Sequence, residues 1–469
     1  MEKSEDIAVL MRENQNVSLK DKLAIVLRLS TPAILAQISE IAMQYIDAAM
    51  VGSLGAGASA AIGLVSSSTW LFGGIIGACA AGFSVQVAHS VGAGNVKSTK
   101  GIFRQSLLSA ISFSLVLLVA GYIIGGYLPK MLGADPSIWK DATAYFRIFC
   151  LFIPIRQLNY LGLNMLQCSG NMKTPGIMAT LMCTLDVIFN FLLIFPTRDL
   201  TLFSTIFRIY GAGMGVAGAQ LGTSLAVLVC MILVLYKCIF KFEKLRIDRG
   251  EGSFIPQKKV LREAVRIGLP MALEQSALCL AMVVSTRLVA PLGTVAIAAN
   301  SFAITAESIC YMPGYGIGSA STTIVGQAFG AKRNDLAYSF AWLTTFTGMA
   351  IMTCTAILMY FLCPYVFAFL TPDLSVREAG IHVLRLELIA EPLYAASIVA
   401  TGAMRGAGDT LIPGIMNLIS IWGLRLTMAF FLTRTMGLSG YWIAMTVELC
   451  FRGIIFLLRL KSRKWMEKK

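Results

Sequence analysis

The sequence predicts an all-α membrane protein in which twelve transmembrane helices form two six-helix lobes related by a parallel internal repeat. The first reason is composition: of 469 residues, 57% are hydrophobic and 14% are charged, whereas soluble proteins carry about 25% charged residues. The second is that the apolar residues stand in long runs, and the third is that the second half of the chain repeats the first. This composition excludes a water-soluble enzyme.

Twelve apolar runs are candidates for membrane spans, because about 20 apolar residues cross a bilayer core as a helix. An even number of spans returns the chain to the side on which it started. The runs lie at 24–50, 58–90, 105–128, 143–167, 176–196, 212–236, 264–290, 297–328, 337–371, 380–404, 411–433 and 439–458.

Basic residues are concentrated on one side of these spans. The two tails and the loops on their side hold 25 Lys and Arg, and the opposite loops hold 6. Because basic residues accumulate on the cytoplasmic side of membrane proteins, we expect both termini in the cytoplasm and a multi-pass protein of the cytoplasmic (inner) membrane. The same rule explains the net charge of +14 without a nucleic-acid partner.

The second half of the chain matches the first at one constant difference in residue number, the difference between Pro32 and Pro270, which we call the repeat offset. Prolines and glycines keep this offset across four spans, which chance matches between apolar helices would not produce. Each copy holds six spans, so both copies share one topology, as in transporters whose parallel repeats rock around a central cavity. Further matched pairs are Gly92 and Gly330, Pro154 and Pro392, and Gly170 and Gly408.

The repeat and the charge pattern divide the chain into five segments. The N-lobe spans 24–236 and the C-lobe 264–458, and the basic linker 237–263 between them contains eight Lys and Arg. Residues 1–23 are expected to be a cytoplasmic segment, since their polar start does not form a cleavable signal. Residues 459–469 are expected to be a basic cytoplasmic tail.

Polar residues inside the first span form one stripe. Gln37, Glu40, Gln44 and Asp47 recur at spacings of three and four residues, which places them on one face of a helix. A charge at the bilayer centre costs about 2.5–3.5 kcal/mol, so this face should line the lobe interior or an aqueous cavity. Asp47 is a candidate for ion or proton binding, and the alternative is a satisfied structural carboxylate near Gly52.

The fifth span carries Asp186 and Asn190, one helical turn apart on one face. Carboxylate and amide oxygens suit a hard cation such as Na⁺, and a carboxyl group in low dielectric can instead carry a proton. A helix–helix hydrogen bond is the structural alternative. Thr223 in the sixth span could add a hydroxyl group to such a site.

The C-lobe lacks a partner of Asp47, because the repeat offset leads to Ser285. Its other intramembrane charges could pair with each other, as Glu448 and Arg452 could across one helical turn. Acidic groups in an apolar cavity would suit an organic cation. The residues predicted to line a substrate path are Gln37, Glu274, Gln275, Glu307 and Glu391.

No motif of a standard enzyme or ATPase occurs in the chain. HExxH, GxSxG and Walker A patterns are absent, and His89 and His382 belong to no metal-like cluster. An intramembrane enzyme would need a nucleophile with a base, or a metal site, within the bilayer. We therefore expect no enzyme activity and no cofactor, and an ion gradient as the energy source.

Four segments together resemble the multidrug and toxic compound extrusion (MATE) family of the MOP flippase superfamily, and the resemblance runs from about Leu27 to Arg459. It implies a Na⁺- or H⁺-coupled antiporter that exports cationic, amphipathic drugs through a V-shaped cavity between two lobes. The segments are QYIDAAMVGSLG (44–55), MLQCSGNMKTPG (165–176), VGQAFGAKR (325–333) and AMRGAGDTLIPG (403–414).

The resemblance also implies roles for individual residues. The family's acidic residue on the first helix falls on Asp47, and its pair on the fifth helix falls on Asp186 and Asn190, in reversed order. The acids that some members carry on the seventh and tenth helices fall on Leu278 and Tyr394, so Glu274 and Glu391 would substitute from a neighbouring turn or the C-lobe site would be absent.

The expected function is a secondary active multidrug efflux antiporter that works by alternating access. The coupling ion, H⁺ or Na⁺, would bind at Asp47, Asp186 and Asn190, with Glu40, Gln44 and Thr223 around them. A lipid-linked glycan flippase of the same superfamily is the alternative. We expect small-molecule, cationic drugs and membrane lipids as partners, and a monomer.

Overall fold

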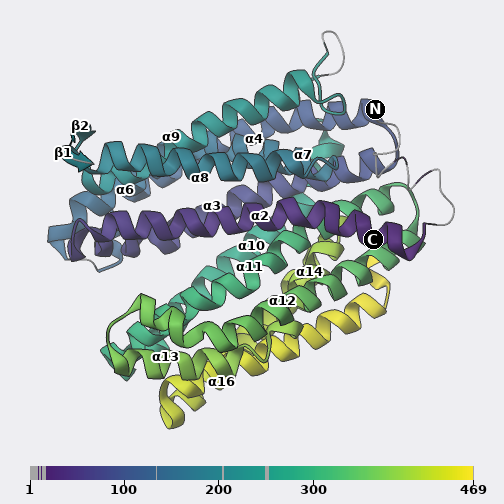
Figure 1. Cartoon of the computed structure of the whole chain (residues 1–469). Helices are drawn as coiled ribbons and strands as arrows, with labels where there is room; N and C mark the ends of the chain where they lie inside the picture. Colours follow the sequence, from purple (N-terminus) through teal and green to yellow (C-terminus); the bar gives the residue numbers. More distant parts are fainter. Residues whose placement is uncertain are drawn as a thin grey trace.

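The computed structural model describes residues 9, 12, 17–133, 135–202, 205–248 and 253–467, and these residues are mainly helical (Figure 1). The helices form two groups, one from the N-terminal half of the chain and one from the C-terminal half. Both ends of the chain lie at the same end of the molecule (Figure 1). We call this end the terminus side and the opposite end the far side.

The N-lobe contains six membrane-spanning segments, one of which is built from two helices. A β-hairpin lies on its far side, and a short π-helix continues its last span. The elements are α2 (Leu19–Gly52), α3 (Ala56–Gly92), α4 (Val96–Gly125), α5 (Leu128–Met131), η2 (Pro136–Ile138), α6 (Trp139–Leu151), α7 (Ile153–Cys168), α8 (Lys173–Ile194), β1 (Pro196–Leu202), β2 (Thr205–Ala212), α9 (Gly215–Tyr236) and η3 (Lys237–Lys241).

The C-lobe repeats this order of helices after the linker. The described residues of the linker dock on the N-lobe, where Lys100 forms an ion pair with Asp248. The elements of the C-lobe are α10 (Lys258–Val289), η4 (Ala290–Leu292), α11 (Thr294–Gly330), α12 (Asn334–Leu370), α13 (Leu374–Glu387), α14 (Glu391–Ala407), α15 (Leu411–Leu418), η5 (Ile419–Arg425), α16 (Leu426–Lys461) and η6 (Lys464–Met466).

The predicted twelve spans are confirmed. Eight described helices are long and apolar enough to cross a membrane singly: α2, α3, α4, α8, α9, α10, α11 and α12. The other four spans are interrupted helices. Two are the pairs α6–α7 and α13–α14, in which Pro154 and Pro392 occupy the first turn of the second helix, a position that proline tolerates. The last two meet at Gly437 within α16, where the backbone leaves the helical conformation at φ +61° and ψ −139°.

The repeat predicted from the sequence is also confirmed by the backbone. Helices α3 and α11 begin at residues 56 and 294, and α4 and α12 begin at residues 96 and 334, so both pairs keep the repeat offset. The turn residues follow the same rule, since Gly170 has a φ of +93° and Gly408 a φ of +89°. These helix starts and turns of the two lobes therefore correspond to each other.

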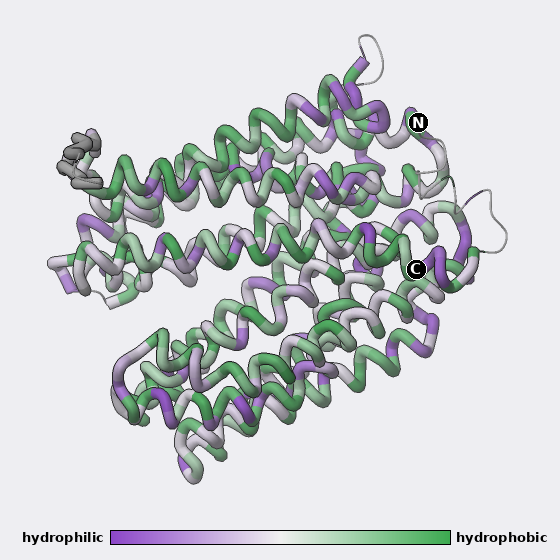
Figure 2. The backbone as a smooth tube through the Cα atoms, viewed as in Figure 1, coloured by the Kyte–Doolittle hydropathy of each residue, from purple (hydrophilic) through white to green (hydrophobic). Residues whose placement is uncertain are grey.

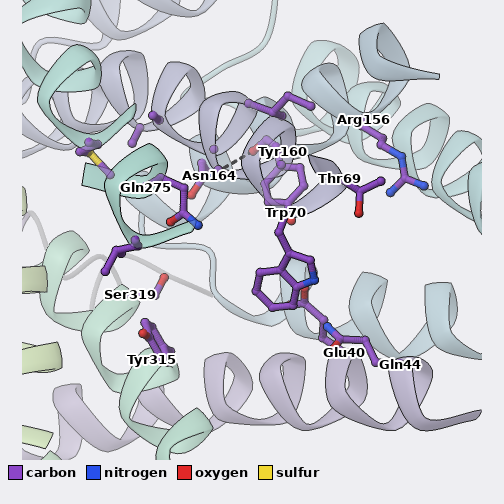
Figure 3. A pocket seen from close by; sticks show the side chains of 18 of the residues that line it. Glu40, Gln44, Thr69, Trp70, Arg156, Tyr160, Asn164, Gln275, Tyr315 and Ser319 are labelled. Carbon is purple, nitrogen blue, oxygen red and sulfur yellow. Dashed lines mark hydrogen bonds between the residues drawn. The ribbon is translucent and has the colours of Figure 1, made fainter. Parts of the chain in front are cut away.

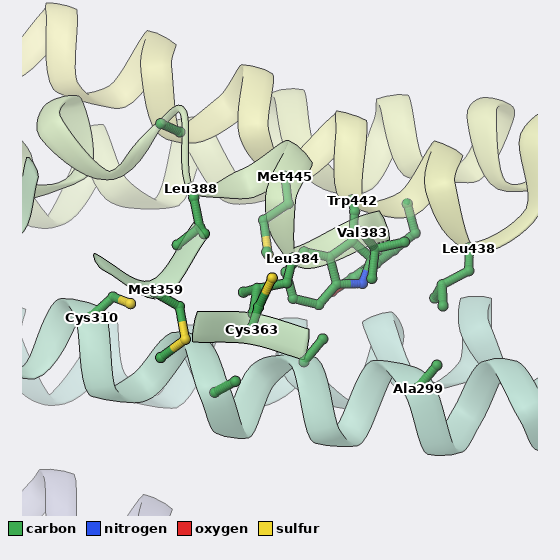
Figure 4. Close-up of a cluster of buried hydrophobic side chains, with 14 of the residues drawn as sticks. Ala299, Cys310, Met359, Cys363, Val383, Leu384, Leu388, Leu438, Trp442 and Met445 are labelled. Atoms are coloured by element: carbon green, nitrogen blue, oxygen red, sulfur yellow. The ribbon is translucent and has the colours of Figure 1, made fainter. Parts of the chain in front are cut away.

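Apolar side chains both fill the lobes and cover them. One core of the C-lobe gathers around Trp442, Leu384 and Cys363, between α11, α12, α13 and α16 (Figure 4). Large apolar side chains also point outward, and Phe369 is 91% exposed. Hydrophobic residues follow the middle of the helices, and hydrophilic residues gather at the terminus side (Figure 2). Such a surface is stable in lipid and unstable in water.

Replacing Gly437 by alanine tests the bend between the last two spans. A Cβ atom there meets nothing within 4 Å, so the variant keeps its packing but holds a non-glycine residue in a conformation that costs about 1–3 kcal/mol. We expect a lower thermal midpoint in detergent micelles. Gly423→Ala, in a helical glycine of η5, is the matched control. Equal midpoints for the two variants would contradict the strained bend.

Candidate functional site

A cavity of about 960 Å³ lies between the two lobes. It reaches from Val51 and Ser59, near the far-side ends of α2 and α3, to Cys168 and Arg405, near the terminus-side ends of α7 and α14. The indole of Trp70 extends into it and is 54% exposed (Figure 3). Both lobes therefore contribute walls to one chamber that continues to the far side.

Close helix crossings shut the cavity on the terminus side. Helix α3 of the N-lobe crosses α10 of the C-lobe, and α2 crosses α11. At the first crossing, a Cβ atom on Gly268 would lie 2.8 Å from the carbonyl oxygen of Ala78, and a Cβ atom on Gly82 would collide with the carbonyl oxygen of Ala264. The backbones are in direct contact there, which leaves no room for solvent or a ligand.

Three of the predicted coupling residues meet at the N-lobe wall. The amide nitrogen Nδ2 of Asn190 donates hydrogen bonds to Oδ1 of Asp47 over 2.7 Å and to Oδ2 of Asp186 over 3.0 Å. We call this set the acid–amide bridge. Asp47 comes from α2 and lines the cavity, whereas Asp186 and Asn190 come from α8 and are fully buried behind it.

The acid–amide bridge has oxygen atoms to spare. Oδ1 of Asp186 and Oδ1 of Asn190 are buried and have no hydrogen-bond partner among the residues that the structure describes. Two carboxyl groups joined by one neutral amide repel each other when both are ionised. A proton or a cation with oxygen ligands would relieve that repulsion, so these residues fit either coupling ion.

Three other predicted coupling residues line the cavity near the bridge: Glu40, Gln44 and Thr223. Glu40 and Gln44 stand on the α2 wall (Figure 3). The hydroxyl group of Thr223 donates to the carbonyl oxygen of Ala219 over 3.1 Å, so its oxygen lone pairs remain available as acceptors. The polar stripe predicted on the first span therefore does face a cavity from Glu40 onward.

Gly222 positions the bridge, although nothing in the sequence singles it out. A Cβ atom at Gly222 on α9 would collide with Oδ1 of Asn190 and would lie 3.0 Å from its backbone nitrogen. Only glycine lets α9 pack this closely on α8 at the bridge. A glycine within an apolar run gives no signal of such a contact before the helix pairing is known.

The predicted substrate-path residues divide into two groups. Glu274 and Gln275 line the cavity. Gln37, Glu307 and Glu391 are not among the residues that line it in this structure. Glu307 and Glu391 are buried inside the C-lobe, with exposures of 6% and 0%, because their helices turn these side chains toward the lobe core.

Two of the buried glutamates of the C-lobe form ion pairs with arginines. Arg405 pairs with Glu274 over 2.8 Å, and Asn417 donates to the other carboxylate oxygen of Glu274 over 2.6 Å. Deeper in the lobe, Glu448 lies between two arginines: Arg425 at 2.8 Å and Arg452 at 3.0 Å. The predicted pair of Glu448 and Arg452 is therefore present.

The positive charge of Arg156 on the cavity wall was not predicted from the sequence. Arg156 of α7 lines the cavity, and its guanidinium stacks over the ring of Phe149 at 5.0 Å from the centroid. It forms no ion pair with the residues that the structure describes. The polar stripe on the first span alone suggests an acidic cavity. Arg156 shows that the cavity wall also carries positive charge.

Residues 32–192 and 270–431 match the MatE family model. The two matches begin at Pro32 and Pro270, the pair that defines the repeat offset, and together they cover more than half of the chain. The chain belongs to the MATE family. The family match therefore reproduces the internal repeat and supports the resemblance found in the sequence.

Two bacterial relatives extend this match over almost the whole chain. The "Probable multidrug resistance protein NorM" of Thermotoga maritima is 26% identical over 443 residues, which are 94% of this chain and 92% of that protein. The "Multidrug resistance protein MdtK" of Edwardsiella ictaluri is 27% identical over 459 residues, covering 94% and 95% of the two chains.

Solved structures share the fold of this MATE protein. A MATE transporter in complex with MaL6 superposes with a TM-score of 0.87 at 19% identity, over 98% of this chain and 99% of that chain. A MOP superfamily transporter from Pyrococcus furiosus, described as having a binding pocket of reverse polarity, gives a TM-score of 0.87 at 18% identity and covers 99% of both chains. At these identities the likeness concerns the fold alone.

The pair of Glu274 and Arg405 can be tested by a double substitution. Arg405→Met leaves the carboxylate of Glu274, which is 4% exposed, without its charge partner, and we expect a loss of about 3 kcal/mol of stability. Adding Glu274→Gln should recover much of it, because no buried charge then remains. Thermal unfolding of the purified variants measures both effects. A double variant that is less stable than Arg405→Met would contradict the pairing.

Proposed function

We propose that this protein is a secondary active multidrug efflux antiporter that exports organic cations and amphipathic drugs in exchange for H⁺ or Na⁺. The observation that carries the proposal is the acid–amide bridge of Asp47, Asp186 and Asn190 on the wall of the cavity between the lobes. Two relatives that carry the name multidrug resistance protein add support.

The far side of the cavity is proposed to face outward. Both tails would then lie in the cytoplasm, and the protein would span a cytoplasmic (inner) membrane. The excess of Lys and Arg in the tails and the loops on their side supports this orientation. An external ion reaches the bridge through the open cavity, whereas the crossing of α3 and α10 separates it from the cytoplasm.

Ion binding is proposed to act through α2. A proton or Na⁺ at the bridge neutralises the repulsion between Asp47 and Asp186 and changes how firmly α2 is held to α8. The same helix contacts the C-lobe, where the hydroxyl group of Tyr45 donates to the carbonyl oxygen of Thr305 over 2.7 Å. An ion can shift the equilibrium between two arrangements of the lobes only if it binds one arrangement better than the other. Because α2 contacts both lobes, ion binding at the bridge can favour one arrangement.

The cavity chemistry supports an organic cation as the exported molecule. Glu40 and Asp47 offer negative charge, and Trp70 and Tyr160 offer aromatic faces (Figure 3), to which cations are attracted. The volume of about 960 Å³ lies within the range of about 300–1,000 Å³ typical of drug-sized sites. We propose that the protein works as a monomer in lipid, without a cofactor, an enzyme activity or a nucleic-acid partner.

A lipid-linked glycan flippase is the second candidate, and one observation favours it. Arginine side chains line the cavity at three positions: Arg156, Arg405 and Arg452. Positive charge would suit a diphosphate-linked substrate. However, Arg405 and Arg452 are paired with buried glutamates, which leaves Arg156 as a single cationic group for such a substrate.

Replacing Asp47 by asparagine tests the antiport. Everted membrane vesicles that hold a pH gradient are given a fluorescent organic cation or Na⁺, and discharge of the gradient is recorded. We expect discharge by the drug in the wild type and its loss, by at least about tenfold, in Asp47→Asn, because Asp186 is then the single carboxyl group left in the bridge. Glu263→Gln, at an exposed carboxylate at the end of the linker, is the control and should keep full activity.

The outcomes separate the candidates. Discharge by the drug alone would indicate proton coupling, and substrate movement that follows Na⁺ and ignores pH would make the bridge a sodium site. Normal export by Asp47→Asn would rule out the mechanism. No response to any cation in the wild type would favour the lipid-linked glycan flippase.

A further inference from the structure

Two hydrogen bonds cross between the lobes at the terminus-side end of the cavity. Nε2 of His89 donates to the carbonyl oxygen of Gly406 over 2.7 Å, since a carbonyl oxygen only accepts. Nε2 of Gln327 donates to the carbonyl oxygen of Cys168 over 2.9 Å. The two donors are separated by the repeat offset, and so are the two acceptors. The bonds are therefore copies of each other under the internal repeat.

Both acceptors lie at the ends of helices. Cys168 is the last residue of α7, and Gly406 lies in the last turn of α14. Carbonyl groups in the last turn of a helix lack hydrogen-bond partners within the helix, so each of these two carbonyl oxygens can accept a hydrogen bond from a donor outside its helix. A donor near a helix C-terminus also interacts favourably with the helix dipole.

A glycine turn forms a socket beside each acceptor. Gly170 and Gly408 follow the two helices with φ of +93° and +89°. A Cβ atom on Gly170 would lie 3.4 Å from Nε2 of Gln327, and one on Gly408 would lie 3.7 Å from Cε1 of His89. Each lobe thus offers a helix end and a glycine turn that receive one side chain of the other lobe.

Helices α3 and α11 cross in backbone contact beside these bonds. A Cβ atom on Gly92 would collide with the carbonyl oxygen of Gln327, and one on Gly330 would collide with the carbonyl oxygen of His89. The two glycines are again equivalent under the repeat offset. The residues that carry the donors are therefore the residues against which the opposite helix packs.

We propose that the bonds of His89 with Gly406 and of Gln327 with Cys168 form a latch that holds the terminus side of the cavity shut while the far side is open. The latch goes beyond the proposed antiport, because it assigns the closure to two side chains that are not among those lining the cavity. Both bonds break together when the lobes separate here, since they lie around one crossing. Water then replaces each donor, which keeps the latch weak enough to open in every cycle.

Hydrogen–deuterium exchange of the full-length protein in lipid nanodiscs tests the latch. The variants His89→Phe and Gln327→Met keep the size of the side chain but remove its N–H donor. Each should raise amide exchange in both 85–92 and 323–330, on the order of fivefold, because one of two bonds no longer holds the closed form. Residues 59–66 at the far-side end of α3 should keep their wild-type exchange.

Two controls separate the latch from general damage. His89→Gln puts at position 89 the same side chain that donates the other bond of the latch. Its amide exchange in both segments should stay within about twofold of the wild type. His382→Phe changes an exposed histidine of α13 and should have no effect. Gln327→Met carries the test without disturbing the ring that packs near Phe329, should His89→Phe fail to fold.

Wild-type exchange in both segments of the folded donor-free variants would overturn the latch. A rise confined to the helix that carries the substitution would overturn it too, because a latch couples the two lobes. No drug and no ion gradient enter this measurement. Its outcome is therefore independent of whether the antiport proposal holds.

Discussion

The bilayer core offers no water to a buried charge, and this constraint determines how the polar groups of the chain are arranged. Glu448 satisfies it with two arginines, Arg425 and Arg452, so that a fixed ion-pair network stands inside the C-lobe. Asp47 and Asp186 follow another solution, because their shared partner is the uncharged amide of Asn190. Their negative charge lacks a salt-bridge partner among the described residues. A site that must recruit its counter-charge from solution is suited to an exchangeable ion, whereas the Glu448 network is suited to stability.

The bridge and the latch stand at different levels of the same cavity and are joined by the helices that cross between the lobes. Helix α2 carries Asp47 and also reaches the C-lobe through Tyr45. Helix α3 forms one wall of the cavity and carries His89 of the latch in its last turn. A change in how firmly the bridge holds α2 to α8 therefore acts on helices that cross between the lobes. At the terminus side these lobes are held together by the two weak hydrogen bonds of the latch. Weak closure suits this arrangement, because a coupling free energy of a few kcal/mol is then enough to separate the lobes at the latch.

Those features that follow from spacing along the chain could be predicted from the sequence. Twelve apolar runs, the repeat offset and the polar face at Asp47 are properties of neighbours on one helix or of matched segments, and the backbone agrees with them. Contacts between distant helices left no such trace. Arg405 meets Glu274 across 131 residues, and Gly222 touches Asn190 only because α9 packs on α8. Such partners are determined by tertiary packing. The types of side chain limit which contacts are possible, but they do not specify which residues meet.

The two copies of the repeat share backbone features, whereas the polar side chains at equivalent positions differ. The turns, the helix starts and the acceptors of the latch recur at one offset, and only the latch donors differ, as histidine and glutamine. The bridge does not recur, because the repeat offset leads from Asp47 to Ser285 and from Asp186 to Leu424. A rocking movement about a pseudo-two-fold axis requires equal backbones on both sides of the axis but only one place where an ion is bound. Duplication therefore explains the closure, and its loss of symmetry at the bridge explains why the N-lobe alone carries this set of coupling residues.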